Sequence, residues 1–280
     1  MRGSVFALVG LIVFSVGALA QSPDCDISGN ERAALAKLIN APSRTAYSGS
    51  ILYEQAGGRQ FVSVIWPEAS GQGELKRLNS REDPQPELWR QSISPLGAVC
   101  QLERVYTVNV EAGRVIAGRS TQRVSLRPRD TLRLAQVFEV DRDTGITLGA
   151  TVIDPSGAIL ERFEFANIAL SSMPESVIAP APELEMARAE VIPGYHILTP
   201  HSEQGAVVVG DGLATAAVFV EPLPPGSPAG EGATQRGATL TYARGVADGQ
   251  QGVLITVMGE IPIVTARLLA DSVHRTQSVR

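Results

Sequence analysis

Short runs of alternating apolar and polar residues fill the first half of the chain, and turn residues separate them. The runs 47–54 and 60–66 are joined by Gln-Ala-Gly-Gly, a combination that predicts a β-hairpin. Val62, Val64 and Trp66 occupy one side of the second run, because successive side chains of a strand point to opposite faces. The predicted hairpin therefore has one apolar face.

The same pattern continues over residues 100–169, with a turn about every ten residues. Residues 141–145 and 155–157 have the Asp, Pro and Gly content of tight turns. The strand-like runs between the turns are 100–110, 123–127, 131–140, 146–154 and 158–169. The large apolar residues that share a face in these runs are Leu132, Leu134, Phe163 and Phe165. This succession predicts an antiparallel sheet with an apolar concave side.

One helix is predicted ahead of the strands. Ser28 and Glu31 have the spacing of a capping box, and residues 33–39 are rich in Ala and Leu at helical spacing. We expect this helix to cover the concave side of the sheet. Residues 68–95 are polar and broken by Gly and Pro, so no element is predicted there.

A Pro-, Ala- and Glu-rich stretch then interrupts the pattern, and residues 173–187 are interpreted as a linker. A second, smaller unit follows over 188–280, and the first unit spans 25–172. Strand-like runs in the second unit are 189–198, 206–209, 214–220, 239–243 and 252–258, and residues 263–273 have helical spacing. Residues 222–232 are interpreted as a long Pro- and Gly-rich loop. The predicted fold class is α+β.

The first 20 residues have the pattern of a cleavable signal peptide. Arg2 precedes an apolar run over 5–19, and Ala18-Leu19-Ala20 is a small-x-small cleavage site. The apolar run is shorter than the roughly 20 residues that span a bilayer, which favours a signal peptide over a membrane anchor. We therefore expect a mature chain that begins at Gln21 and lies in the periplasm.

Composition adds two further constraints. The net charge is −5 and no Lys- and Arg-rich patch with interleaved aromatic residues is present, so nucleic acid is not expected as a partner. The two cysteines are Cys25 and Cys100. In an oxidising compartment they can pair as a disulfide, and the sequence leaves open whether they pair or remain as two thiols.

The sequence shows no pattern typical of a catalytic or metal site. Residues 141–145 begin like a calcium loop but the later ligands are missing, so a hairpin turn is favoured. His196 and His201 do not have the spacing of a zinc site, and the chain has no Gly-x-Ser-x-Gly elbow. We expect a binding protein without metal or cofactor rather than an enzyme.

Several short motifs, in order along the chain, resemble the MucB/RseB family of periplasmic negative regulators of sigma-E. In the first unit they are Ala117-Gly118-Arg119, Arg127–Asp130, Asp141–Gly145, Asp154–Gly157 and Leu160–Phe165. In the second unit they are Ile192–Tyr195, Gly210–Ala214, Phe219–Leu223 and Val257–Pro262. The chain departs from the family after Asp130, where Arg133-Leu134-Ala135 stands in place of Arg-Tyr-Gly.

The resemblance implies a fold and a function. The first unit is expected to resemble the lipoprotein carriers LolA and LolB, an unclosed antiparallel β-barrel with helices, and the second to be a smaller α+β domain. The protein is expected to bind the periplasmic domain of a membrane-spanning anti-sigma factor of the RseA/MucA type. It would thereby shield that domain from regulated proteolysis and keep sigma-E signalling off.

The resemblance also implies a ligand cavity in the first unit, for lipid, lipopolysaccharide or a lipoprotein. The candidate lining consists of Val62, Val64, Trp66, Leu132, Leu134, Phe163 and Phe165. The alternative is that these residues form an ordinary filled core. The alternative function is a periplasmic carrier of lipid or lipoproteins, because the first unit alone fits that class.

Overall fold

The computed structural model describes residues 27–41, 45–56, 58–66, 73–78, 87–89, 99–172, 190–199, 206–224, 226–227, 229–246 and 252–277. The predicted signal peptide, the linker over 173–187, Cys25 and His201 lie outside these residues. Within the described ranges, no helix has the length and apolar character needed to cross a bilayer.

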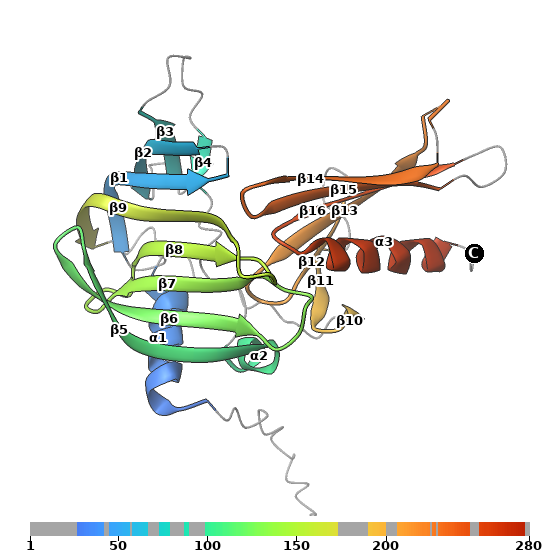
Figure 1. Ribbon diagram of the computed structural model, residues 1–280. Coiled ribbons are helices and arrows are strands. Elements are labelled where there is room, and N and C mark those ends of the chain that lie inside the picture. Colours follow the sequence, from blue (N-terminus) through green and yellow to red (C-terminus); the bar gives the residue numbers. More distant parts are fainter. Residues whose placement is uncertain are drawn as a thin grey trace, which may run out of the picture.

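The first unit is a nine-stranded antiparallel sheet that stays open, with β4 at one edge and β5 at the other. Its strand order is β4-β3-β2-β1-β9-β8-β7-β6-β5. The strands are β1 (Thr45–Gln55), β2 (Gly58–Trp66), β3 (Gly73–Arg77), β4 (Glu87–Trp89), β5 (Tyr106–Ile116), β6 (Arg119–Pro128), β7 (Ala135–Asp141), β8 (Thr147–Ile153) and β9 (Ile159–Ser172). The sheet curves around helix α1 (Gly29–Asn40), as Figure 1 shows.

Local sequence accounts for the hairpins that join these strands. The β1–β2 hairpin runs from the Tyr47–Trp66 pair to the Gln55–Gly58 pair, as the alternation predicted. Between β7 and β8, the Asp141 carboxylate accepts hydrogen bonds from the Thr144 backbone N–H at 2.9 Å and from the Thr144 hydroxyl at 2.6 Å. This side-chain capping confirms that residues 141–145 form a hairpin turn.

Two helices cover part of the concave face. Ser28 and Glu31 form the predicted capping box of α1, and Leu35 and Leu38 of this helix are buried on the sheet. Residues 100–110 were expected to form one strand, and that prediction was wrong, because helix α2 (Val99–Val105) precedes β5. Its apolar residues recur every three positions, and Leu102 among them is fully buried in the first core.

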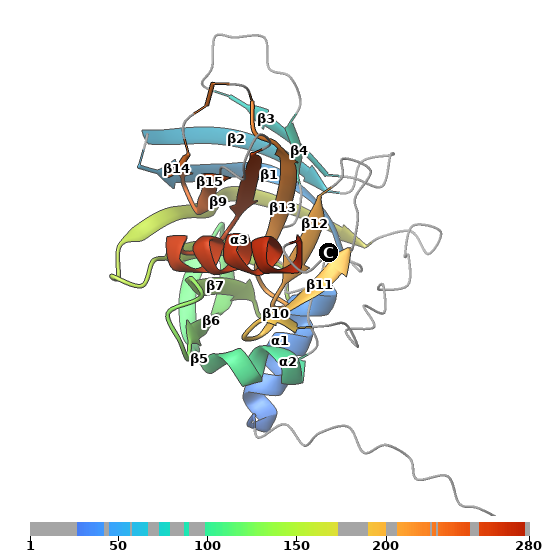
Figure 2. The ribbon, with the colours of Figure 1, turned by 90° about the vertical axis from the view of Figure 1, so that its right-hand side faces the viewer.

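The second unit is a seven-stranded antiparallel sheet in the order β10-β11-β12-β13-β16-β15-β14. Its strands are β10 (Glu190–Ile192), β11 (Tyr195–Thr199), β12 (Val207–Gly210), β13 (Thr215–Pro222), β14 (Gly230–Arg236), β15 (Thr239–Val246) and β16 (Val253–Gly259). Helix α3 (Ile263–Gln277) packs on one face of this sheet, as Figure 2 shows. The α+β class with an unclosed antiparallel sheet is therefore confirmed.

Candidate binding cleft and the joint between the units

A buried ion pair joins the two units. Arg133 lies just before β7, and its side chain is fully buried. Its Nε donates to Oδ2 of Asp211, in the β12–β13 turn, at 2.9 Å. The Tyr106 hydroxyl, at the start of β5, donates to the same oxygen at 2.8 Å. Because an unpaired charge in such a site would be strongly destabilising, these contacts fix the β12–β13 turn against the first unit.

The remaining donors of Arg133 are also occupied by the protein. The guanidinium forms an ion pair with Asp130, and Nη2 donates to the Pro193 carbonyl at 2.7 Å. The Tyr195 ring lies 4.8 Å from the Arg133 guanidinium carbon, an arrangement that stabilises a buried cation. Burial raises the pKa of the Tyr195 hydroxyl well above its usual value, and the negative charge of Asp211 adds to the shift.

Each unit also contributes one apolar side chain to the core of the other. Leu213, in the β12–β13 turn, is buried in the core of the first unit. Leu132, just before β7, packs on the core of the second unit, and its carbonyl accepts a hydrogen bond from Thr265 of α3 at 2.6 Å. The β12–β13 turn is held in shape by Asp211, whose Oδ1 accepts from the backbone N–H groups of Leu213 and Ala214. We call these contacts around Arg133, Asp211 and Leu213 the joint.

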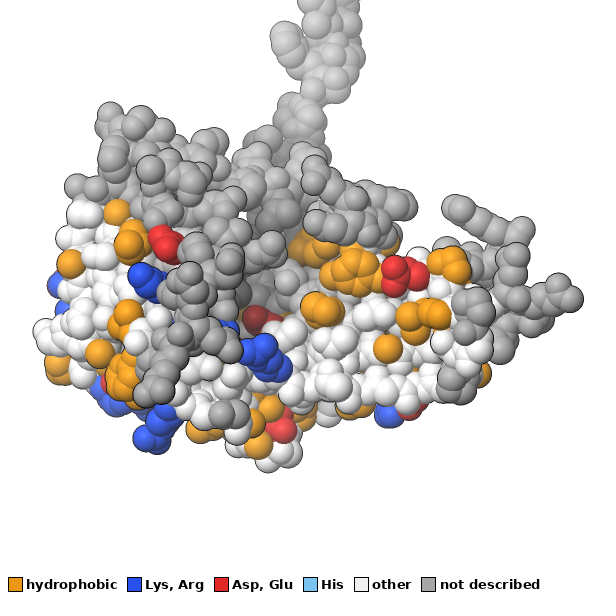
Figure 3. Space-filling view, turned by 90° about the horizontal axis from the view of Figure 1, so that it is seen from above, with side chains coloured by type: hydrophobic (Ala, Val, Ile, Leu, Met, Phe, Trp, Pro, Cys, Tyr) orange, Lys and Arg blue, Asp and Glu red, His pale blue; other side chains and the backbone are white. Residues whose placement is uncertain are grey.

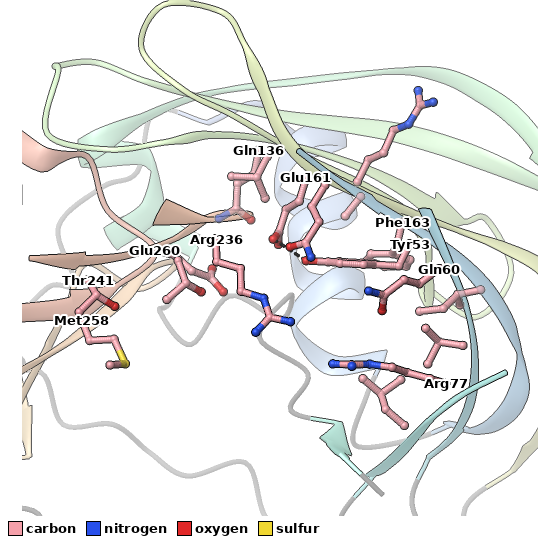
Figure 4. Close-up of a pocket in the computed structure, with 18 of the residues that line it drawn as sticks. Tyr53, Gln60, Arg77, Gln136, Glu161, Phe163, Arg236, Thr241, Met258 and Glu260 are labelled. Atoms are coloured by element: carbon pink, nitrogen blue, oxygen red, sulfur yellow. Dashed lines mark hydrogen bonds between the residues drawn. The ribbon is translucent and has the colours of Figure 1, made fainter. Parts of the chain in front are cut away.

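A cleft of ≈ 640 Å³ lies beside the joint, between the concave face of the first sheet and the second sheet. Figure 4 shows side chains from both sheets pointing into it. Its lining from the first unit comprises Ile51, Tyr53, Gln55, Gln60, Val62, Leu75, Arg77, Gln136, Ala150, Val152, Glu161, Arg162 and Phe163. The second unit contributes Thr234, Arg236, Thr239, Thr241, Met258 and Glu260. In Figure 3, charged side chains lie at the boundary between the units, with hydrophobic side chains on either side.

One carboxylate in the cleft accepts hydrogen bonds from both units. Oε2 of Glu161, on β9, accepts from the Tyr53 hydroxyl of the same unit at 2.7 Å. The same oxygen accepts from the Ala238 backbone N–H, in the β14–β15 turn of the second unit, at 2.9 Å. Burial, together with the charge of Glu161, raises the pKa of the Tyr53 hydroxyl above its usual value. Glu161 is therefore an acceptor shared by both units.

A second carboxylate, that of Glu260, projects into the same cleft from the end of β16 (Figure 4). Burial raises its pKa to about 7, and the negative charge of Glu161 contributes to the same shift. The cleft thus has apolar walls, two neighbouring carboxylates and the guanidinium groups of Arg77 and Arg236. No group of three or more His, Cys, Asp or Glu side chains in the described part of the chain is arranged to hold a metal ion.

The structure divides the seven predicted lining residues among three places. Val62 and Phe163 line the cleft and also belong to the first core. Val64, Trp66 and Phe165 pack in the first core and do not line the cleft. The role of these residues in binding a lipid stays a prediction.

Leu132 and Leu134 lie at the boundary between the units and not on the cleft wall beside Phe163. Leu134 packs with Val152 and with Ala238 of the second unit. Both leucines precede Ala135, where β7 begins, so the strand alternation used to place them on one face does not apply.

Sequence reasoning missed Tyr53, Glu161 and Glu260. The sequence contained a signal for Glu161. It lies two and four residues before Phe163 and Phe165 in the same strand, so alternation places its side chain on their concave face. A polar residue at such a position is a candidate for a specific contact. No comparable signal identifies Glu260, which reaches the cleft through the packing of the second sheet against the first.

Cys100, in α2, is disulfide-bonded in the structure. The chain has one other cysteine, Cys25, which lies outside the described residues. The pairing of Cys25 with Cys100 stays a prediction.

Comparison with known proteins identifies the family. Residues 79–191 match the MucB/RseB N-terminal domain, and residues 190–274 match the MucB/RseB C-terminal domain. The chain belongs to the MucB/RseB family. The adjoining matches cover most of the two sheets and α3, so both domains of the family are present in this chain.

The chain is similar to the sigma factor AlgU regulatory protein MucB of Pseudomonas aeruginosa, with 27% identity over 286 residues that cover 86% of this chain and 89% of that protein. Its fold is similar to MucB in the P. aeruginosa MucA/MucB complex, with a TM-score of 0.65, 23% identity and coverage of 86% of this chain and 97% of that one. A structure of MucB in complex with MucA(peri) gives a TM-score of 0.63, 25% identity and coverage of 85% and 96%.

Proposed function

We propose that this member of the MucB/RseB family is a periplasmic regulator that binds the periplasmic segment of a MucA-like anti-sigma factor. By holding that segment, it keeps an AlgU-type sigma factor inactive. The observation that carries the proposal is the fold match to MucB in complex with MucA(peri), which covers 96% of that chain and therefore includes both units. A carrier built from the first unit alone would not need the second sheet.

The joint supports a binding role that uses both units together. A partner segment that contacts two units gains affinity when their relative position is already fixed, because less freedom is lost on binding. The buried Arg133–Asp211 pair and the insertion of Leu213 into the first core provide that fixed position. We propose that the bound segment lies across both units, where it is shielded from proteolysis.

We further propose that the cleft takes a lipid or another acylated envelope molecule that weakens partner binding. Its volume of ≈ 640 Å³ falls within the usual range of ligand sites, and Val62, Phe163 and Met258 supply apolar walls. Arg77 and Arg236 would face an anionic headgroup. A ligand can release the partner only if it binds the free form more tightly than the complex.

A protease-protection assay tests this function. The full mature chain is mixed with the periplasmic segment of the MucA-like protein from the same organism, and cleavage of the segment is followed over time. We expect the chain to slow cleavage and a lipid with an anionic headgroup to restore it. The variant Met258→Asp, at an exposed position of the cleft wall, should keep protection but lose the lipid effect, while Val264→Asp, at a similarly exposed position of α3 outside the cleft, serves as the matched control.

The outcomes separate the two functions that the sequence left open. Protection that lipid relieves supports the regulator. Lipid binding without any protection of the segment would contradict it and would favour a periplasmic carrier of lipid or lipoproteins.

A further inference from the structure

The contact between the units at the cleft combines one charged acceptor, Glu161, with the apolar packing of Ala238 against Leu134 and Val152. Glu161 accepts hydrogen bonds from the Tyr53 hydroxyl of the first unit and from the Ala238 N–H of the second, both at its Oε2. Gly237 precedes Ala238 with φ +59°, and an added Cβ there would come within 2.2 Å of the same oxygen. The β14–β15 turn is therefore fitted closely against the Glu161 carboxylate.

Glu260 brings a second carboxylate to this contact from the opposite unit. It lies at the end of β16, it is partly buried, and Glu161 is the charged group that acts on it most directly. The other titratable groups that face the cleft are Tyr53 on β1, Arg77 on β3, Arg162 beside Glu161 on β9, and Arg236 on β14. Arg162 pairs with Glu54, and the Arg236 charge acts on Tyr53. Glu161 is the charged group that shifts the pKa of Glu260, and the Arg236 guanidinium lines the same cleft.

We propose that protonation of Glu260 controls how tightly the second unit closes on the first across the cleft. With Glu260 neutral, Glu161 is the one negative charge of the pair and keeps its two donors. With Glu260 ionised, two carboxylates from opposite units repel each other in a site of limited solvation. That repulsion opposes the Glu161–Ala238 hydrogen bond, so the β14–β15 turn moves away while the joint holds the units together.

The direction of the pH dependence follows from the two states of Glu260. In the closed cleft its pKa is about 7, whereas in an opened, hydrated cleft it returns toward the ordinary value of 4.5. Between these values the closed form binds a proton that the open form has released. Raising the pH through this window therefore favours opening, by on the order of 100-fold in the equilibrium constant.

The consequence for regulation rests on the proposed function, because it makes partner binding and ligand entry sensitive to the pH of the compartment. The movement itself requires neither partner nor ligand. It can therefore be tested on the isolated chain, and its failure would leave the proposed function untouched.

The test measures the distance between spin labels placed on Lys76 of β3 and Gln235 of β14, two exposed positions on either side of the cleft. Distance distributions are recorded at pH 5.5 and pH 8. We expect a longer or broader distribution at pH 8 in the parent chain and no change with pH in Glu260→Gln. Glu221→Gln, an exposed carboxylate of β13 outside the cleft, is the matched control and should behave like the parent.

A titration of the Glu260 side-chain carboxyl by nuclear magnetic resonance complements the distances. A midpoint near pH 7 that falls toward 4.5 in Gly237→Ala, where the turn cannot seat, agrees with the proposal. Distances that do not change between pH 5.5 and pH 8 in the parent chain, or a change that persists in Glu260→Gln, would overturn it.

Discussion

Arg133 illustrates how single residues hold the two units together. Its guanidinium is fully buried and is neutralised by Asp211 of the second unit and by Asp130. Removing one partner of such a pair leaves the other charge buried, which costs about 3–5 kcal/mol. We therefore predict that Arg133→Met lowers the free energy of unfolding by that amount in denaturant titrations. Arg127→Met, at an exposed position of β6, should change it by less than about 0.5 kcal/mol. Equal losses in the two variants would contradict a stabilising joint.

Glu260 predicts a pH dependence of stability as well as of cleft closure. Its pKa of about 7 in the folded chain exceeds the ordinary value of 4.5, so the folded state binds more protons than the unfolded state between these values. Stability therefore falls as the pH rises through this window. We predict that Glu260→Gln raises the free energy of unfolding at pH 8 by roughly 1–3 kcal/mol, and that the gain disappears below pH 4.5. A gain that is the same at pH 4 and pH 8 would show that ionisation of Glu260 is not its cause.

The β14–β15 turn is the element that closes the cleft, and two glycines allow its role to be measured. Gly237 and Gly157 both have positive φ, but an added Cβ overlaps the Glu161 carboxylate at Gly237 and meets open space at Gly157. Alanine costs about 1 kcal/mol or more at either position for backbone reasons alone. We predict that Gly237→Ala is clearly more destabilising than Gly157→Ala in thermal unfolding. Similar losses of thermal stability in the two variants would mean that the β14–β15 turn does not pack against the Glu161 carboxylate.

Helix α2 carries Cys100, which is disulfide-bonded. If Cys25 is the partner, the bond closes a long loop that includes α1, which stabilises the fold by roughly 4–5 kcal/mol on the chain-entropy model. We predict that thiol labelling of the native protein finds no free thiol, and that peptide mapping recovers Cys25 linked to Cys100. Two labelled thiols would contradict the pairing.

Elements with a strong local signal could be predicted from the sequence, and those formed by long-range pairing could not. The α1 capping box and the hairpins around Asp141 and Gly58 follow from nearby residues. Strands β3 and β4 lie in the segment 68–95, where no element was predicted, because they form by pairing with β2 and with each other. Strand β14 begins inside the segment that was predicted to be a loop. It was not predicted because all its residues are exposed and the sequence shows no apolar–polar alternation there.

The candidate site was less predictable than the fold because it also depends on contacts between residues far apart in the sequence. A cleft between two sheets depends on how the units pack, and periodicity within one strand carries no information about a neighbour from the other unit. Alternation places Val62 and Phe163 on the concave face, but it also places Val64 and Phe165 there, and these two do not line the cleft. The joint could not be predicted, because Arg133 lies in a run predicted as a strand and Asp211 in a turn, 78 positions apart, and neither shows a signal for the other.

We propose that the two units work as one binding protein with a fixed joint and an adjustable cleft. The joint sets their relative position through Arg133 and Leu213, and the cleft between the sheets is available to a ligand. Under this proposal, a small molecule or protons would tune the binding of a protein segment, because both would act at the boundary that the segment is proposed to span.

The proposed partner binding can be measured by calorimetric titration of residues 21–280 with the periplasmic segment of the MucA-like protein from the same organism. We predict saturable binding that Arg133→Met weakens and Arg127→Met leaves unchanged, because the proposed binding site spans two units whose relative position the joint fixes. Heats that show no binding to the folded parent chain would contradict it.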